Sequence, residues 1–285
     1  MKALTIARFT VQEAISRRLV LAGALISLVF VGLFALGFSF LYGEATKNAV
    51  ARGNANDFGV VFAGAFLTVL GLYAVHFLAS FLALFLSVGA ISGEIDSGTL
   101  HAVLARPIRR AEYVLGRWLG FAGLIAVYVG VMAGLLLLLA RAIAGYEAPD
   151  PLRAIALMML GSLLLLTVSL FGSTLLSTLA NGVLVFSLFG LAWLAGVIEF
   201  LGDIMSNAAM LNLGIVVSLL IPSDAIWRGA SYYVQSPAFL TVAFGRGSIP
   251  FATSAPPAAP LIVWAILYPL VFILAAVWAF SRRDL

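Results

Sequence analysis

Residues 19–42 read LVLAGALISLVFVGLFALGFSFLY, a stretch without Asp, Glu, Lys, Arg or His. As an α-helix it would be about 36 Å long at about 1.5 Å per residue, enough to cross a hydrocarbon core of about 30 Å. Arg17 and Arg18 precede it, and no small-residue cleavage site appears before Gly43. We therefore expect a retained transmembrane helix here and no cleaved signal peptide.

The composition of the whole chain indicates the same environment. Of the 285 residues, 63% are hydrophobic and 10% are charged, and the mean hydropathy is +1.13. Soluble domains carry about 25% charged residues, so a water-soluble fold could not bury this much apolar surface. We expect a single all-α transmembrane domain, residues 1–285, with about six transmembrane helices: 19–42, 59–90, 118–144, 154–179, 183–200 and 261–280.

The segment before the first span, residues 1–18, predicts an amphipathic interfacial helix. Its polar and apolar residues fall on different stripes at helical spacing, and Glu13 lies four residues before Arg17, which favours pairing. We expect this helix to lie along the membrane surface against lipids, with Arg8, Glu13, Arg17 and Arg18 as its functional residues. The alternative is a short soluble extension of the first span.

Basic residues indicate the topology. They gather before the first span, between the second and third spans, and after the last. With six spans all three clusters fall on one side, which the positive-inside rule makes cytoplasmic. We therefore expect a multi-pass protein of the inner (plasma) membrane with both termini in the cytoplasm.

Two connections between spans need separate interpretation. Ala180, Asn181 and Gly182 predict a tight turn between the fourth and fifth spans. Residues 201–260 contain an apolar run, 208–221, that is short for a crossing, and a seventh span would place the last basic cluster outside. This region predicts re-entrant or interfacial helices and a small cap on the external side.

Several classes of function are excluded by what the chain lacks. It has no cysteine, and His76 and His101 are too few for most His-based metal centres, so we expect no metal site. It has no G-x-x-x-x-G-K-[ST] loop, so we expect no ATP hydrolysis, no enzyme activity and no cofactor in this chain. Its short basic segments between apolar spans are not a nucleic-acid footprint.

The spans also carry few ionisable residues. Away from their ends His76 is the only one, which argues against an ion- or proton-coupled carrier. We expect His76 to form a hydrogen bond to a neighbouring helix rather than to relay protons. Glu199 and Asp203, four residues apart at the end of the fifth span, could bind a cation, but solvated charges are the simpler interpretation.

The cytoplasmic connection, residues 91–117, has the most informative pattern. Ser97 and Thr99 are candidate caps, and residues 99–105 can form about two helical turns before Pro107 ends them. A short helix held crosswise between two membrane helices is suited to contact another protein.

The same connection carries an apolar ridge and a ring of charge. Leu100, Val103 and Leu104 recur at helical spacing and would face a partner together. Three basic residues follow them, Arg106, Arg109 and Arg110. Charge alone fits a solvated positive-inside loop equally well.

Here the residues resemble a known family. Residues 94–100 read EIDSGTL, 105–107 read ARP, and 112–117 read EYVLGR. This pattern resembles permease subunits of type-2 ABC exporters, most closely the group that includes the nitrous-oxide reductase maturation transporter. The opening residues 6–10, IARFT, are similar too.

The resemblance implies a division of labour. The chain would be a permease that works as a homodimer or with a paralogous permease, beside separate cytoplasmic ABC ATPase subunits that bind ATP and Mg²⁺. Glu94, Thr99 and Leu100 would begin a coupling helix, and residues 1–18 would form the connecting helix at the membrane surface. The exit of the coupling helix would be fixed by Arg106, Pro107, Arg109 and Arg110.

The conduit should lie where two copies meet, because no single span carries a polar pathway. The first, second and fifth spans are candidates for this contact, since small residues allow close helix approach, among them Gly32, Gly37, Gly64 and Gly190. A lining of Phe, Leu, Ser and Thr would suit an amphipathic or lipid-like cargo.

The sequence also allows two other functions. The chain could be a stand-alone secondary transporter or channel, which would transport in liposomes without an ATPase. It could also be a non-transporting scaffold for assembling another membrane complex. A neighbouring gene for a soluble ATPase would favour the permease.

The topology is directly testable. A reporter that works only in the cytoplasm should be active when it is fused after Leu285, because the three basic clusters share one side. An external reporter at this position would rule out the six-span arrangement.

Overall fold

The structure is a computed structural model that describes residues 2–16, 18–52, 58–98, 109–237, 239–240 and 251–283. Within these residues, six helices are long and apolar enough to cross a membrane. They are α2 (Arg18–Ala51), α3 (Phe58–Ser87), α6 (Arg110–Ala144), α7 (Pro151–Leu175), α8 (Thr178–Ile204) and α12 (Ala259–Ser281). The all-α class and the six predicted spans are confirmed.

Some helices extend beyond the apolar runs that predicted them. α2 continues past Tyr42 to Ala51, where Lys47 pairs with Glu44 at 3.0 Å one turn away. α6 begins at Arg110, ahead of its apolar part, because the Glu112 side chain accepts a hydrogen bond from the Arg109 backbone N–H at 3.1 Å. Polar residues therefore extend these helices beyond the lengths that the apolar runs predicted.

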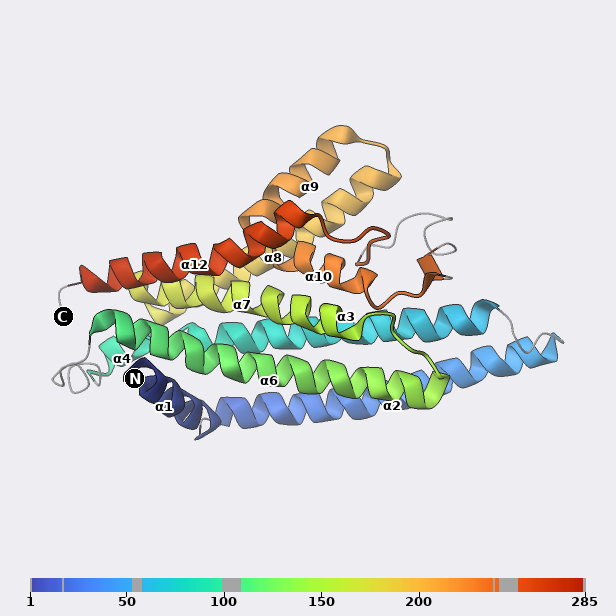
Figure 1. Ribbon diagram of the computed structural model, residues 1–285, viewed down its shortest axis with the longest axis horizontal. Helices are drawn as coiled ribbons and strands as arrows, with labels where there is room; N and C mark the ends of the chain where they lie inside the picture. The colour runs from blue at the N-terminus through green and yellow to red at the C-terminus, as the bar shows by residue number, and fades with distance from the viewer. Residues whose placement is uncertain are drawn as a thin grey trace.

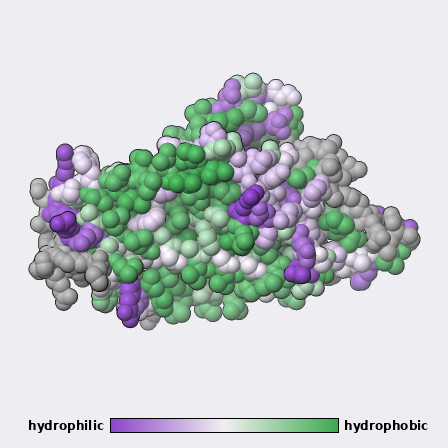
Figure 2. All heavy atoms as spheres, in the orientation of Figure 1, coloured by the Kyte–Doolittle hydropathy of each residue, from purple (hydrophilic) through white to green (hydrophobic). Residues whose placement is uncertain are grey.

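The spans form an elongated bundle with two polar ends. α2, α3, α6, α7 and α12 run along its long axis, and both chain ends lie at the same end (Figure 1), which we call the N/C end. Apolar residues cover a broad band beside the N/C end, and hydrophilic residues gather at the N/C end and again on the far side of this band (Figure 2). This is the distribution expected for a chain surrounded by hydrocarbon.

Burial separates central from peripheral helices. In the most apolar window of α7, 67% of the residues are buried, against 6% in α2. The consecutive residues Leu164, Leu165 and Leu166 are all buried, so α7 is covered on every side. α2 lies at the periphery and leaves most of its apolar side chains uncovered within the chain.

The predicted amphipathic helix is α1 (Lys2–Ser16), which packs on the start of α6. Gly116 and Gly120 of α6 allow this approach, because an added Cβ would lie 2.6 Å from Ile6 Cβ and 2.7 Å from Thr10 Cβ. Thr10 is buried in the contact and donates its hydroxyl to Ile6 O at 2.9 Å. Other apolar residues of α1 remain exposed: Leu4, Phe9 and Ile15.

The turn predicted at residues 180–182 is wrong. α7 ends at Leu175 and α8 begins at Thr178, so these residues lie inside α8. Ser177 caps α8, since its hydroxyl accepts a hydrogen bond from the Ala180 N–H at 3.5 Å. Asn181 is buried and donates its amide to the carbonyl oxygens of Val88 and Ser169, each at 2.8 Å. Its side chain thus joins α8 to α7 and to the turn that follows α3, instead of forming a turn itself.

A bent helix pair follows α8. α9 (Ala208–Leu220) and α10 (Ser223–Tyr232) meet at 105°, which fits the predicted re-entrant or interfacial pair rather than a straight seventh span. The α8–α9 hairpin leans away from the bundle, whereas α10 lies against it (Figure 1). The Trp227 indole N–H donates to Phe251 O at 2.9 Å, so the chain beyond the undescribed residues 241–250 returns to cover α10.

The close packing around Asn181 can be tested by adding one methyl group to a neighbouring glycine. In Gly172→Ala, the new Cβ would lie 2.0 Å from Asn181 Oδ1, forcing α7 and α8 apart. We expect a loss of about 1–3 kcal/mol, measured as a lower Tm in detergent. Gly134→Ala, whose Cβ would meet nothing within 4 Å, is the control and should not lower Tm. Equal Tm values for both variants would contradict the close contact at Asn181.

Candidate functional site

A buried cluster of charge at the N/C end centres on Arg117. The residue is 5% exposed, yet its guanidinium meets two carboxylates. Nη1 lies 2.6 Å from Glu13 Oε2, and Nη2 is in contact with Glu94 Oε1. Nε donates to the Tyr113 hydroxyl at 3.3 Å, and that hydroxyl donates to Glu94 Oε2. We call these four residues the Arg117 cluster.

The cluster joins segments that are distant in sequence. Glu13 belongs to α1, and Glu94 lies in the first turn of α4 (Ser92–Asp96), the short helix that follows α3. Tyr113 and Arg117 are one turn apart on α6, so their side chains share a face. One cation therefore fixes α1, the end of the α3–α4 segment and the start of α6 together.

Contacts beside the cluster attach the last helix. The Tyr113 ring stacks on Phe280 of α12, with centroids 5.8 Å apart. Arg110 Nη1 donates to the carbonyl oxygens of Phe280 and Ser281, both at 3.0 Å, and of Arg283 at 2.7 Å. These carbonyls end α12, and a cation there satisfies them and the negative end of the helix dipole.

The electrostatics of the cluster make it rigid. Burying a charge in a low-dielectric region is costly unless the charge is paired and hydrogen-bonded. Arg117 and Glu94 are mostly buried, whereas the Glu13 side chain is 40% exposed. Separating Arg117 from Glu94 would leave two desolvated charges, so α4 and α6 are expected to move as one unit. The arrangement suits transmission of force rather than bond chemistry.

The predicted site residues divide into two sets. Of the described ones, Glu94 and Glu13 lie in the Arg117 cluster, Arg109 and Arg110 begin α6, and Arg8 is exposed on α1. The backbone of Arg18 begins α2. The other predictions lie outside the described residues: Arg17, Thr99, Leu100, Val103, Leu104, Arg106 and Pro107.

Arg117 and Tyr113 were not among the predicted site residues. Both residues occur in the quoted EYVLGR stretch, but a basic residue beside an apolar span is typical of a positive-inside loop. The spacing of Tyr113 and Arg117 by one helical turn was the available signal. Their carboxylate partners are on other helices and could not be identified without the fold.

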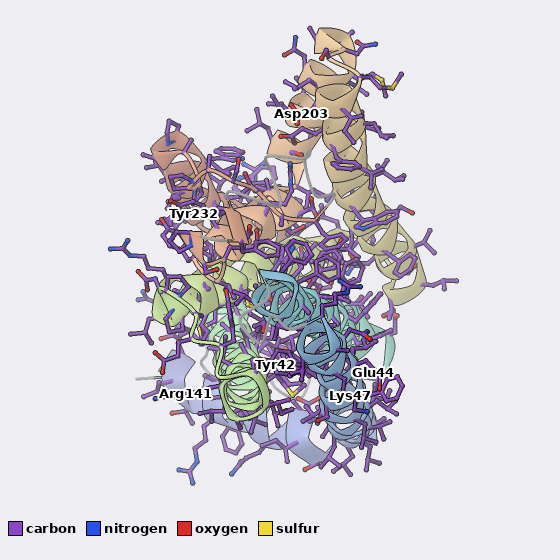
Figure 3. The ribbon with its side chains drawn as sticks, turned by 90° about the vertical axis from the view of Figure 1, so that its right-hand side faces the viewer. Tyr42, Glu44, Lys47, Arg141, Asp203 and Tyr232 are labelled. Carbon is purple, nitrogen blue, oxygen red and sulfur yellow. The ribbon has the colours of Figure 1, made fainter. Side chains whose placement is uncertain are left out.

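A second charged cluster lies in the α8–α10 region. Arg228 Nη2 lies 2.6 Å from Glu199 Oε2 on α8, and Arg228 Nε lies 3.2 Å from Asp224 Oδ2 on α10 itself. All three side chains are mostly buried, so the simpler interpretation of Glu199 as a solvated charge is wrong. Asp203, by contrast, lies on the hairpin that stands away from the other spans (Figure 3).

His76 joins α3 to α10 by ring packing. It is buried, and its ring stacks on Trp227 of α10 with centroids 5.5 Å apart and planes 23° apart. Its Nδ1 has no hydrogen-bond partner among the described residues. His76 therefore packs α10 onto α3 and does not form the predicted hydrogen bond through Nδ1. The described residues contain no group of His, Asp and Glu suited to a metal ion.

Comparison with known proteins gives a family match. The model for a family described as ABC-2 family transporter protein matches residues 4–285, nearly the whole chain. No curated protein matches the chain.

The Arg117 cluster is testable through the stability of α1. Arg117→Met would leave the Glu94 carboxylate buried without its cation, at a cost of about 3–5 kcal/mol. We expect a lower Tm and faster protease cleavage in α1. The control is Arg141→Met, because the Arg141–Glu147 pair is 67% and 68% exposed and should contribute only about 0–1 kcal/mol. If α1 were cleaved at the same rate in both variants, the cluster would not hold it.

Proposed function

Because the chain belongs to the ABC-2 transporter family and is the permease subunit of an ABC transporter, we propose that it exports its cargo as a dimer driven by separate cytoplasmic ATPase subunits. The family implies an ABC ATPase partner in general. ATP and Mg²⁺ would bind to that partner, since this sequence has no phosphate-binding loop of the Walker type.

The Arg117 cluster is the observation that carries the proposal. The undescribed residues 99–108 lie between α4 and α6, and Glu94 and Arg117 join these two helices. A protein that pushed on the intervening segment would therefore move α3, α6 and α1 together. This supports Glu94 and residues 99–105 as the coupling segment that receives motion from the ATPase.

The orientation follows from the same end of the bundle. Both chain ends, α1 and α4 lie together (Figure 1), and the basic clusters of the sequence belong to this end. By the positive-inside rule, we place it in the cytoplasm, with the protein in the inner membrane. The ATPase would then bind where α4 and α6 meet.

The proposed dimer contact involves α2 and α8. An added Cβ at Gly32 or Gly37 of α2, or at Gly190 of α8, would meet nothing within 4 Å. Gly64 is different, because its Cβ would lie 3.4 Å from Ala144 within the same chain. The open glycines support close packing of a second copy, identical or paralogous, on α2 and α8.

An aromatic face supports a hydrophobic or amphipathic cargo. Phe77 and Phe81 of α3 contact Phe189 of α8, with centroids 5.3 and 5.7 Å apart. Phe85 and Phe186 continue this face and are 58% and 57% exposed. We call it the α3–α8 aromatic face and propose that it lines the conduit, since it offers large apolar surface and no charge.

The coupling assignment can be tested at its apolar ridge. The double variant Leu100→Asp/Leu104→Asp would bury unpaired charge against the ATPase, at a cost of about 3–5 kcal/mol. The ridge lies outside the spans, so the variant should still insert in the membrane and dimerise. We expect it to lose co-purification with the ATPase and transport.

The matched control is Leu100→Met/Leu104→Met, which conserves side-chain volume and should retain both co-purification with the ATPase and transport. If the Asp variant bound the ATPase as tightly as the Met variant, residues 99–105 would not be the docking segment. The solvated-loop interpretation would then account for this connection.

A further inference from the structure

The second charged cluster, formed by Glu199, Asp224 and Arg228, lies where α10 meets α8. Glu199 comes from the last two turns of α8, and the other two residues lie one turn apart on α10. Their side chains are 27%, 11% and 15% exposed, respectively. We call these three residues the α10 cluster.

The two carboxylates bind Arg228 unequally. Glu199 Oε2 accepts a hydrogen bond from Nη2 at 2.6 Å, a short charge-assisted contact between helices. Asp224 Oδ2 is 3.2 Å from Nε, but Nε has no hydrogen-bond partner among the described residues. The contact between helices is therefore the well-formed one, and the contact within α10 is incomplete.

Docking of α10 also depends on a glycine of α8. An added Cβ at Gly196 would lie 2.2 Å from Asp224 Oδ2, so the carboxylate rests where a side chain would otherwise be. Gly190, two turns earlier on the same helix, faces open space. Steric fit and charge pairing therefore bring α8 and α10 together at the same place.

α10 lies at one end of the α3–α8 aromatic face. The Trp227 ring stacks on His76 of α3, with centroids 5.5 Å apart, and contacts Tyr73 of α3 in a tilted arrangement, with centroids 5.3 Å apart. The Tyr73 hydroxyl accepts a hydrogen bond from the Trp193 indole of α8 at 2.8 Å. Tyr73 in turn contacts Phe77, with centroids 5.0 Å apart, so α10 packs beside this face at the end that is farthest from the Arg117 cluster.

We propose that Arg228 is a latch that holds α8 on α10 and closes this end of the conduit. The latch rests on the proposed function, because cargo leaving between α3 and α8 requires α8 to part from α10. Asp224 gives the latch a second position. When Glu199 departs with α8, Arg228 can complete its hydrogen bonds to Asp224 on its own helix. The cation is then never left unpaired, so the closed and open arrangements can both exist.

The latch makes opposite predictions for its two carboxylates. Glu199→Gln weakens the contact between helices and should favour the open arrangement. Asp224→Asn removes the alternative partner and should keep Arg228 on Glu199. Gly196→Ala should open the contact sterically with every charge retained. If these residues only stabilised the fold, all three variants would shift the contact between α8 and α10 in the same direction.

Distances between spin labels can test this in the full chain. The sequence has no cysteine, so Leu201→Cys on α8 and Leu138→Cys on α6 provide two label sites without background. The labelled chain would be mixed with unlabelled chain in nanodiscs and measured by double electron–electron resonance. The measurement needs neither ATPase nor cargo, so its failure is distinct from failure of the exporter proposal.

We expect a longer-distance population in Glu199→Gln and Gly196→Ala. Asp224→Asn should retain the short distance of the parent chain. So should the control Gly123→Ala on α6, whose added Cβ would meet nothing within 4 Å. If Gly196→Ala does not fold, Glu199→Gln alone decides whether loss of the contact lengthens the distance between the labels. The latch is refuted if Glu199→Gln retains the parent distance, or if Asp224→Asn lengthens it equally.

Discussion

The guanidinium of Arg117 is shared by carboxylates from two other segments, Glu13 of α1 and Glu94 of α4. Because buried charges are tolerated only when they are paired, these segments cannot separate from α6 without a large electrostatic cost. Tyr113 extends the same contact to α12 through Phe280. The placement of α1, of α4 and of the start of α6 therefore depends on one cation.

Polar side chains perform the same joining role elsewhere in the bundle. In hydrocarbon no water can satisfy a backbone group at a helix end, so a neighbouring helix must do so. α9 shows this, since its last carbonyl oxygens, of Leu219 and Leu220, accept hydrogen bonds from Trp264 at 3.0 Å and Tyr268 at 2.8 Å. These bonds allow α9 to end against α12, where the chain bends by 105° into α10.

Apolar run length was sufficient to predict the six spans and the bent pair, because hydrocarbon thickness limits both. Partners distant in sequence could not be predicted. Glu199 was predicted to be a solvated charge because its partner Arg228 lies on another helix. Asn181 was predicted to form a turn because its acceptors lie outside α8, on α7 and in the turn after α3. The Arg117 cluster was missed for the same reason. Sequence periodicity identifies a face of a helix, whereas the fold determines what that face meets.

Gly116 and Gly120 link the packing of α1 on α6 to the length of an ion pair. They set the separation of the two helix axes, and this separation fixes how far Glu13 must reach to meet Arg117. A methyl group at either position would lengthen the ion pair although neither residue is charged. The strength of this ion pair thus depends on the lack of a side chain at both glycines. Sequence variation at these two uncharged positions would weaken the Glu13–Arg117 contact as a loss of charge does.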